Sequence, residues 1–134
     1  MKNQIIKTIA TIVLSVGVFM WVVTRPYAEP PTLTASYYGK ESKGLTSCGE
    51  YFDGSSNTCA VWEIDGKPIP MHSLLKLTLG PNSVITRVND RGPNKRLLKS
   101  RQIDVSEAVF RKLNNNDTSA GLIKVKVEIL RLGK

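Results

Sequence analysis

Two short segments of the chain combine carboxylates with glycines and aromatic residues. The first is Cys48-Gly49-Glu50-Tyr51-Phe52-Asp53, in which Glu50 and Asp53 are three positions apart. The second is Asn89-Asp90-Arg91-Gly92-Pro93. Carboxyl groups crowded into a partly buried site have their pKa values pushed apart, so that one can act as an acid while another stays ionised. Acid–base chemistry by Asp53, Glu50 and Asp90 is therefore one hypothesis, although from the residues alone solvated loop carboxylates are the favoured interpretation of Glu50 and Asp53.

The same carboxylates have structural interpretations that the residues alone leave open. Asp90 could accept backbone N–H bonds in a turn shaped by Gly92 and Pro93, and Asp104 could be a helix N-cap. The pair three positions apart could be ordinary solvated loop carboxylates, because that spacing alone is weak evidence. Choosing between these interpretations requires knowing which elements hold the residues.

Strands dominate the elements that must position these residues. Alternation of apolar and polar residues predicts a closing strand over Ile123–Ile129 and another over Leu75–Leu79. The turn Gly80-Pro81-Asn82 then leads into Val84–Val88, which predicts a hairpin. A first strand is expected over Leu33–Tyr38.

One helix and one long loop complete the expected elements. The helix runs from about Ser106 to Leu113, with Asp104 or Ser106 as its N-cap. Five glycines between Gly39 and Pro70 predict a loop on which a site could be built. Short strands, many turns and one short helix suggest a small β-barrel with a helical insertion.

The amino terminus has the features of an export signal. Residues 1–28 carry Lys2 and Lys7 at their start and no charged residue from Thr8 to Thr24. Cleavage after Ala28 competes with an uncleaved anchor through residues 5–23, because the uncharged stretch lies between the lengths typical of a signal and a membrane span. The segment has no cysteine, which excludes a lipoprotein. Residues 29–32 read as a linker, and either alternative places the domain in the periplasm or cell envelope.

The two cysteines and the single histidine have separate interpretations. Cys48 and Cys59 are the only cysteines, and an exported domain folds under oxidising conditions, so we expect a disulfide between them. Two free thiols are the alternative. His72 is the only histidine and has no cysteine or second histidine at ligand spacing. We therefore expect no metal and no cofactor, and we interpret His72 as a surface or strand-end residue.

Four motifs in order resemble the rare lipoprotein A (RlpA) family. They are Ala35-Ser36-Tyr37-Tyr38-Gly39, Gly49-Glu50-x-Phe52-Asp53, Asn89-Asp90-Arg91-Gly92-Pro93 and Ile103-Asp104-Val105-Ser106. The resemblance implies a mainly β fold over residues 33–132, a six-stranded double-psi β-barrel with one short helix. An N-terminal hydrophobic leader helix would precede it.

The resemblance also implies an activity, endolytic lytic transglycosylation of peptidoglycan. Such enzymes cleave between N-acetylmuramic acid (MurNAc) and N-acetylglucosamine (GlcNAc) without water and leave 1,6-anhydro products, and the resemblance implies a preference for peptide-free strands. Carried over to this chain, it favours Asp53 as acid/base, Glu50 as its charged neighbour and Asp90 in the same groove. The expected substrate-binding residues are Tyr38, Trp62, Asn89, Arg91 and Asp104.

One departure from the family keeps a second function open. The family places a histidine eight residues after the aspartate, where this chain has Val61. A non-catalytic, expansin-like module that binds cell-wall glycan is therefore the alternative. A third interpretation is a structural or inhibitory partner of another wall enzyme.

The basic residues indicate the kind of partner. The chain has 134 residues, 41% of them hydrophobic, and a formal net charge of +8, and no acidic residue lies between Asp90 and Asp104. No aromatic residue interleaves with this basic stretch for base stacking, so nucleic acid is rejected as a partner. Peptidoglycan glycan strands are the expected partner, and we expect a monomer. The short length excludes a multidomain enzyme or a polytopic membrane protein.

Overall fold

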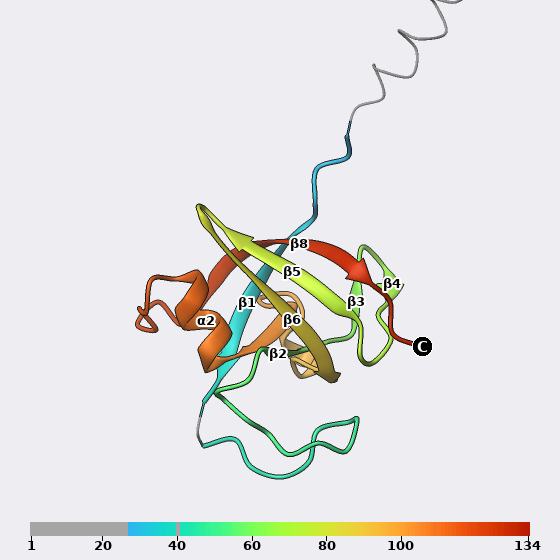
Figure 1. Cartoon of the computed structure of the whole chain (residues 1–134), viewed down its shortest axis with the longest axis vertical. Helices are drawn as coiled ribbons and strands as arrows, with labels where there is room; N and C mark the ends of the chain where they lie inside the picture. The colour runs from blue at the N-terminus through green and yellow to red at the C-terminus, as the bar shows by residue number, and fades with distance from the viewer. Residues whose placement is uncertain (1–26, 40) are drawn as a thin grey trace, which may run out of the picture.

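A closed six-stranded barrel forms the body of the protein (Figure 1). The computed structural model describes residues 27–39 and 41–134. The six barrel strands are joined in the order β1, β7, β2, β6, β5, β8. In chain order they are β1 Thr32–Tyr38, β2 Thr58–Val61, β5 Leu74–Leu79, β6 Asn82–Asp90, β7 Ile103–Ser106 and β8 Ile123–Arg131.

Two parallel strand pairs distinguish this barrel from a simple meander. β1 runs parallel to β7, and β2 runs parallel to β6, whereas the other four pairings are antiparallel. Parallel neighbours require crossover connections. The chain between β2 and β6, and the longer chain between β1 and β7, make these crossovers, so strands that are distant in sequence become neighbours.

The predicted hairpin and strands are confirmed. β5 and β6 pair up to Leu79 opposite Asn82, and Gly80, with φ of +56°, supplies the left-handed residue of the turn. The Asn82 side chain donates to the Leu113 carbonyl at 3.0 Å and so joins the hairpin to the end of the helix.

Within the described residues one α-helix is present, α2 (Glu107–Leu113), and it follows β7 without a break. Ser106 is its N-cap, and the hydroxyl accepts the Val109 N–H at 3.2 Å. Of the two caps that the sequence allowed, Asp104 is therefore wrong, because the helix begins at Glu107 and the residue directly before it is Ser106. Phe110 anchors the helix against β1 through a ring contact with Tyr37 at 4.7 Å. A 3-10 turn, η1, covers Lys95–Leu97.

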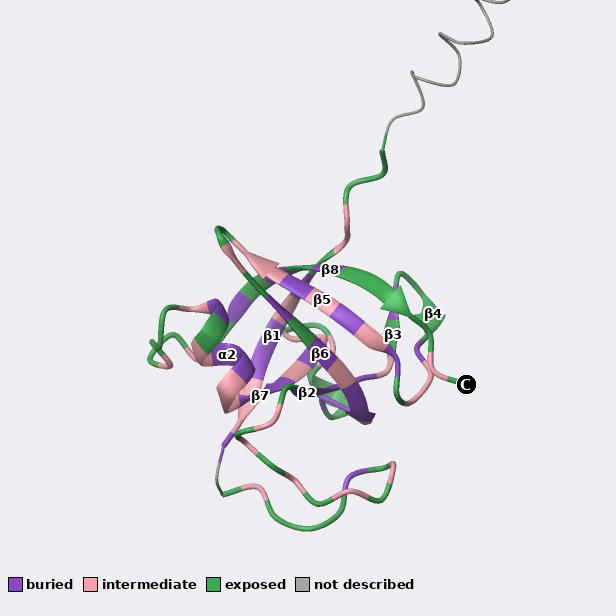
Figure 2. Ribbon diagram, in the orientation of Figure 1, coloured by how far each residue is buried: buried purple, intermediate pink, exposed green. Residues whose placement is uncertain are grey.

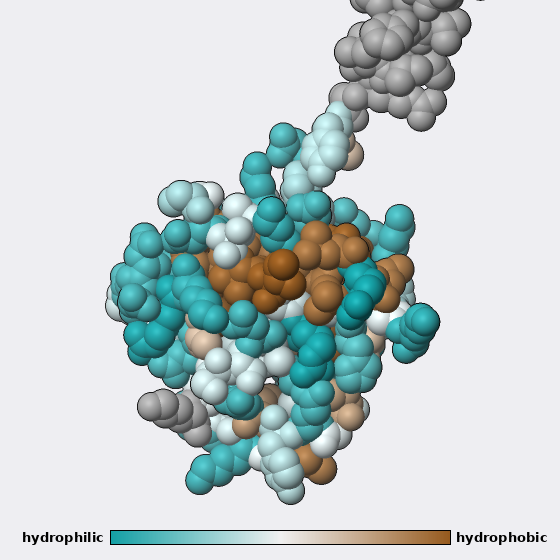
Figure 3. Space-filling model, viewed as in Figure 1, coloured by the Kyte–Doolittle hydropathy of each residue, from teal (hydrophilic) through white to brown (hydrophobic). Residues whose placement is uncertain are grey.

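Apolar side chains from all six strands and α2 fill the barrel (Figure 2). Leu75, Leu77, Val88, Val105 and Val125 are fully buried. Apolar residues also gather on the outer face over β5, β6 and β8 (Figure 3), where Ile85, Ile129 and Leu130 are exposed. Among the residues that the structure describes, no helix is long and apolar enough to cross a membrane.

Two expectations about the segment from Gly39 to Pro70 are corrected. The segment contains β2 and a small hairpin of β3 (Glu63–Ile64) and β4 (Lys67–Pro68), so it is not wholly a loop. All four residues of β2 are buried, so it lacks the alternation by which a half-buried strand is recognised.

The expected disulfide is also absent, since Cys48 and Cys59 are both free thiols. The physical reason is that Cys59 points into the barrel core and is fully buried, whereas Cys48 lies on the preceding loop. There its thiol lies 3.4 Å from the Thr46 hydroxyl. The expected leader, with its cleavage site after residue 28 and its helix, falls largely on residues 1–26, outside the described part of the chain.

Candidate active site

A row of small and acidic residues crosses four adjacent strands. Ser36 on β1 pairs with Asp104 on β7, Asp104 pairs with Ala60 on β2, and Ala60 pairs with Asp90 on β6. The Ser36 hydroxyl donates to the Asp104 carboxylate. The two predicted aspartates therefore flank a single alanine, and both carboxyl groups can reach one ligand.

Gly92 allows the chain to pass close over this row. A Cβ at Gly92 would lie 3.1 Å from the Ala60 Cβ and 3.5 Å from the Asp104 Oδ2. The glycine of the Asn-Asp-Arg-Gly-Pro motif is thus required by a close approach of backbone to side chains.

Tyr38 places a phenol between the two aspartates and the loop. Its hydroxyl lies 2.6 Å from the Thr58 hydroxyl, and its ring packs edge-on against Phe52 with centroids 5.5 Å apart. Burial raises the pKa of Tyr38 to about 12, and the nearby charges of Asp90 and Asp104 act in the same direction. Tyr38 is therefore a neutral hydroxyl at physiological pH.

Asp90 is held by the loop that precedes β2. Its Oδ1 accepts the Ser47 N–H at 2.8 Å, the Ser47 hydroxyl at 2.5 Å and the Arg91 N–H at 2.8 Å. The Arg91 guanidinium turns back and donates to the Val61 carbonyl at 3.0 Å. The turn interpretation of Asp90 is thus right in kind, but its main partner is Ser47, 43 positions away.

Glu50 forms a bidentate ion pair with Arg87. The two guanidinium nitrogens donate to the two carboxylate oxygens, each at 2.8 Å, and Asn89 Nδ2 donates to Oε2 at 3.3 Å. Donation from Arg87 and Asn89 lowers the pKa of Glu50 to about 2. Asn89 is only 3% exposed, so it supports Glu50 from within the protein and does not itself face the solvent.

Arg87 was not predicted as a site residue. It occupies an outward position of β6, in alternation with the buried Thr86 and Val88. A charged residue beside the Asn89-Asp90 motif is the only signal that the sequence offers, and it does not identify the partner 37 positions away.

His72 lies on the other side of Arg87. Its Nδ1 is 3.3 Å from Arg87 Nη1, and its backbone N–H donates to the Val88 carbonyl at 2.7 Å. The residue has φ of +64°, in the left-handed region. The side chain is exposed, as expected, but it belongs to the Glu50–Arg87 cluster.

Asp53 is held separately, by its own turn. Oδ1 accepts the Ser55 N–H at 2.9 Å and the Ser55 hydroxyl at 2.6 Å, and Oδ2 accepts the Ser56 hydroxyl at 2.6 Å. These hydrogen bonds lower the pKa of Asp53 to about 2, with the Ser55 hydroxyl as the largest cause. The structure gives no hydrogen bond between Asp53 and Glu50 or Asp90 within the described part of the chain.

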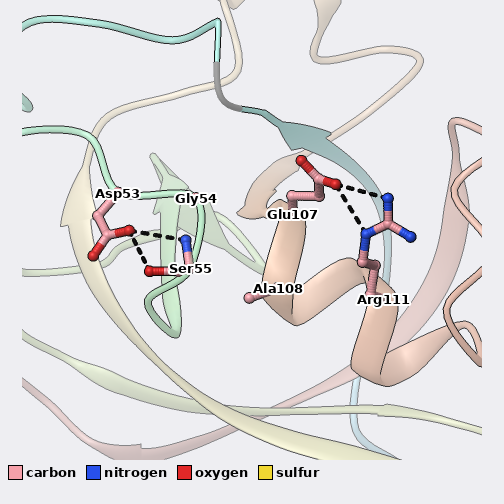
Figure 4. A pocket seen from close by; sticks show the side chains of 6 residues that line it. All are labelled: Asp53, Gly54, Ser55, Glu107, Ala108 and Arg111. Carbon is pink, nitrogen blue, oxygen red and sulfur yellow. Dashed lines mark hydrogen bonds and ion pairs between the residues drawn. The ribbon is translucent and has the colours of Figure 1, made fainter.

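A hollow of about 450 Å³ lies between the Asp53 turn and the start of α2 (Figure 4). Glu107, Ala108 and Arg111 form its helical side, where Arg111 is paired with Glu107 at 2.8 Å. The Ala108 N–H donates to the Gly54 carbonyl at 2.9 Å, which fixes the turn against the helix. Asp53 is therefore exposed at the edge of a preformed hollow.

Trp62 lies away from the acidic row. Its indole N–H donates to the Pro93 carbonyl at 2.8 Å, and Lys95 Nζ lies 4.7 Å from the ring centroid. The ring lines a smaller hollow of about 160 Å³ together with Leu98 and Gln102. In residues 27–39 and 41–134, no three histidine, cysteine or acidic side chains are grouped to hold a metal ion.

Comparison with known proteins identifies related sequences. The sequence model of the lytic transglycolase family matches residues 31–127. The endolytic peptidoglycan transglycosylase RlpA of Vibrio cholerae is 35% identical over 116 residues, which cover 84% of this chain and 40% of that protein. RlpA of Pseudomonas aeruginosa strain PAO1 is 41% identical over 98 residues, covering 71% of this chain and 26% of the relative. The chain thus spans well under half the length of these curated relatives.

Solved structures share the fold. An expansin from Clavibacter michiganensis superposes with a TM-score of 0.55 at 21% identity, covering 78% of this chain and 52% of the expansin. The Streptomyces papain inhibitor gives a TM-score of 0.53 at 24% identity, over 76% of this chain and 96% of the inhibitor. The expected double-psi β-barrel is confirmed at the level of fold.

Proposed function

Because this chain belongs to the lytic transglycolase family, we propose that it is an exported endolytic lytic transglycosylase that cleaves MurNAc–GlcNAc bonds in peptidoglycan. The observation that carries the proposal is the gathering of Glu50, Asp90 and Asp104 around the end of β6. The relatives that are named peptidoglycan transglycosylases support the substrate class.

The reaction moves one proton and adds no water. The C1–O4 glycosidic bond breaks, the muramyl O6 bonds to C1, and the proton of the 6-hydroxyl ends on the leaving O4. The enzyme must supply a proton to O4, a base for the 6-hydroxyl and negative charge near the positively charged anomeric carbon.

The carboxylates divide these tasks. Glu50, held ionised by Arg87, stabilises the positive charge that develops at the anomeric carbon. Asp53 takes the base half of the acid/base role expected for it, because its low pKa leaves it ionised and its carboxylate is exposed. Once it holds the proton of the 6-hydroxyl, Asp53 returns that proton to the leaving O4 as the acid, and Asp90 and Asp104 line the groove beside the neutral Tyr38 hydroxyl.

The remaining expected residues contact the glycan or support the groups that do. Tyr38 and Asn89 orient the groups around the acidic row, whereas Trp62 and Arg91 lie along its continuation toward the basic 3-10 turn. The basic stretch there suits an anionic glycan carrying muramyl carboxylates. We propose a monomer that acts on peptide-free strands in the periplasm or envelope, with residues 1–28 as signal or anchor.

The test is product analysis on purified peptide-free glycan strands. The unaltered chain should release fragments that end in 1,6-anhydro-MurNAc. Glu50→Gln and Asp53→Asn should each lower the rate by roughly 10²-fold or more, the size typical of lost catalytic groups. Asp117→Asn is the matched control, because Asp117 accepts the Ser119 N–H and hydroxyl in a turn like that of Asp53, away from the site.

A non-catalytic, expansin-like glycan binder is the second candidate. Val61, at the position where the family resemblance calls for a histidine, is fully buried in the core. This function predicts that the chain sediments with insoluble peptidoglycan while the fragment profile of that peptidoglycan stays unchanged. Release of 1,6-anhydro fragments by the unaltered chain excludes it.

A further inference from the structure

Arg87 contacts two side chains, those of Glu50 and His72. Through one edge of its guanidinium it holds both oxygens of Glu50 at 2.8 Å, and the same Nη1 lies 3.3 Å from His72 Nδ1. The guanidinium of Arg87 has only N–H donors and no acceptor, so it can only donate in both contacts. Nδ1 of His72 must therefore accept, which leaves the ring proton on Nε2.

This contact fixes what His72 presents to the outside. A neutral imidazole has one donor and one acceptor nitrogen, and the hydrogen bond made by one nitrogen decides which is which. With Nδ1 turned toward Arg87, the exposed Nε2–H faces away from it as a free donor. The Glu50 carboxylate on the other side of Arg87 already accepts from Arg87 and Asn89, and its remaining lone pairs can accept from a ligand.

The position of His72 is set by the fold. Its backbone N–H is bonded to the Val88 carbonyl at 2.7 Å, and the following residue, Ser73, is buried. A non-glycine residue with φ of +64° is uncommon and persists where the surrounding structure holds it. The imidazole is therefore anchored next to β6 and is not a freely moving surface side chain.

We propose that Arg87 is a positioning residue for a donor–acceptor pair, the His72 Nε2–H and the Glu50 carboxylate, and that this pair binds a polar group of the glycan. Neighbouring hydroxyls of a sugar suit such a pair, because one can donate to the carboxylate while the other accepts from the imidazole. The inference rests on the proposed function for its ligand, and it assigns His72 to substrate binding.

The first test uses the fact that His72 is the only histidine of the chain. Long-range ¹H–¹⁵N NMR of the full ¹⁵N-labelled chain then reports one imidazole. We expect the Nε2–H tautomer in the free protein, a mixture of tautomers in Arg87→Met, and a shift of the Nε2 signal when soluble peptide-free GlcNAc–MurNAc oligomers are added. An Nδ1–H tautomer, or a signal that saturating oligomer leaves unmoved, would overturn the proposal.

The second test separates the outer donor from the contact with Arg87. His72→Asn keeps a left-handed residue and an acceptor for Arg87 but cannot place an N–H where Nε2–H lies. We expect KM for peptide-free strands to rise roughly tenfold with kcat within about twofold, the pattern of lost ground-state binding. His72→Gly, which relieves the backbone strain, should show the same rise, whereas Lys126→Ala, which breaks the exposed pair with Glu29, should not.

The two proposals fail in different ways. A chain that gives no 1,6-anhydro product but shows the imidazole shift with oligomer retains this inference and loses the transglycosylase function; in that case the dissociation constant replaces KM. A chain that gives product while His72→Asn and His72→Gly keep the wild-type KM loses this inference alone.

Discussion

Glu50 and Asp53 are three residues apart, and both have a pKa of about 2, but they reach it by different means. Glu50 depends on Arg87, 37 positions away on β6, whereas Asp53 depends on the hydroxyls and N–H of its own turn. The first arrangement exists only when the barrel is folded. The second can form in a short peptide. The two carboxylates are therefore equally ionised, but the pKa of Glu50 depends on long-range contacts and that of Asp53 on local ones.

The largest expected effect comes from removing the long-range partner. Arg87→Leu should lower the rate of 1,6-anhydro product formation by roughly 10²-fold, because Glu50 loses its orientation as well as its counter-ion. Lys126→Leu breaks the exposed ion pair with Glu29, outside the candidate site, and should lower the rate much less. Equal losses in the two variants would show that the Glu50–Arg87 pair has no special role.

The second prediction concerns pH. Since Arg87 keeps the pKa of Glu50 near 2 instead of its ordinary 4.5, the acid limb of activity due to Glu50 should move upward by about two pH units in Arg87→Leu. The limb due to Asp53 should stay in place, because its hydrogen bonds are local. Rate profiles between pH 1.5 and 7 cover both limbs, and an acid limb that does not move in the variant contradicts the assignment of Glu50.

The third prediction concerns stability, with the sign set by the lowered pKa. A carboxylate with a lowered native pKa contributes stability above its unfolded pKa of about 4.5, and that stability is lost as pH falls through about 2. Urea unfolding at pH 7 should therefore show a loss of about 1 kcal/mol or less in Glu50→Gln, because exposed ion pairs contribute about 0.2–1 kcal/mol.

The matched variant sharpens this comparison. Asp53→Asn should leave the urea midpoint unchanged, because the hydrogen bonds of its turn can also form in the unfolded chain. A larger loss for Asp53→Asn than for Glu50→Gln would reverse the distinction between the local and the long-range carboxylate.

The smallest effect is expected in thiol chemistry. Burial raises the pKa of Cys59 to about 12, so it should react with a thiol reagent only after unfolding, while Cys48 reacts in the native chain. Cys48 lies beside Glu50 and Arg87, so Glu50→Gln should change its alkylation rate a few-fold, whereas Asp53→Asn should not. Two reactive thiols in the native chain, or none, would contradict the assignment of Cys59 as buried and Cys48 as partly accessible.

The parts of the fold that the sequence predicted well are those with regular periodicity. The β5–β6 hairpin and β8 alternate clearly, and Ser106 caps α2 by a local rule. β2 was missed because four consecutive buried residues carry no period. The disulfide was wrong because oxidising conditions and a count of two cysteines do not specify where the side chains point.

The sequence named several residues of the candidate site, but it did not predict which of them contact one another. Glu50 and Asp53 were expected to act as a pair, but the hydrogen bonds of the described residues place them in separate groups. Arg87 and His72 were not assigned to the site, because strand register and a left-handed backbone decide their contact. Such contacts are long-range and leave no local pattern.

The central claim is that these carboxylates cleave glycan strands without water, and mass analysis tests it most directly. Peptide-free strands digested by the purified chain in H₂¹⁸O should yield 1,6-anhydro-MurNAc ends that carry no ¹⁸O. Reducing ends labelled with ¹⁸O would show a hydrolase, and intact strands that nevertheless bind the chain would show a glycan-binding module. Either result would contradict the account.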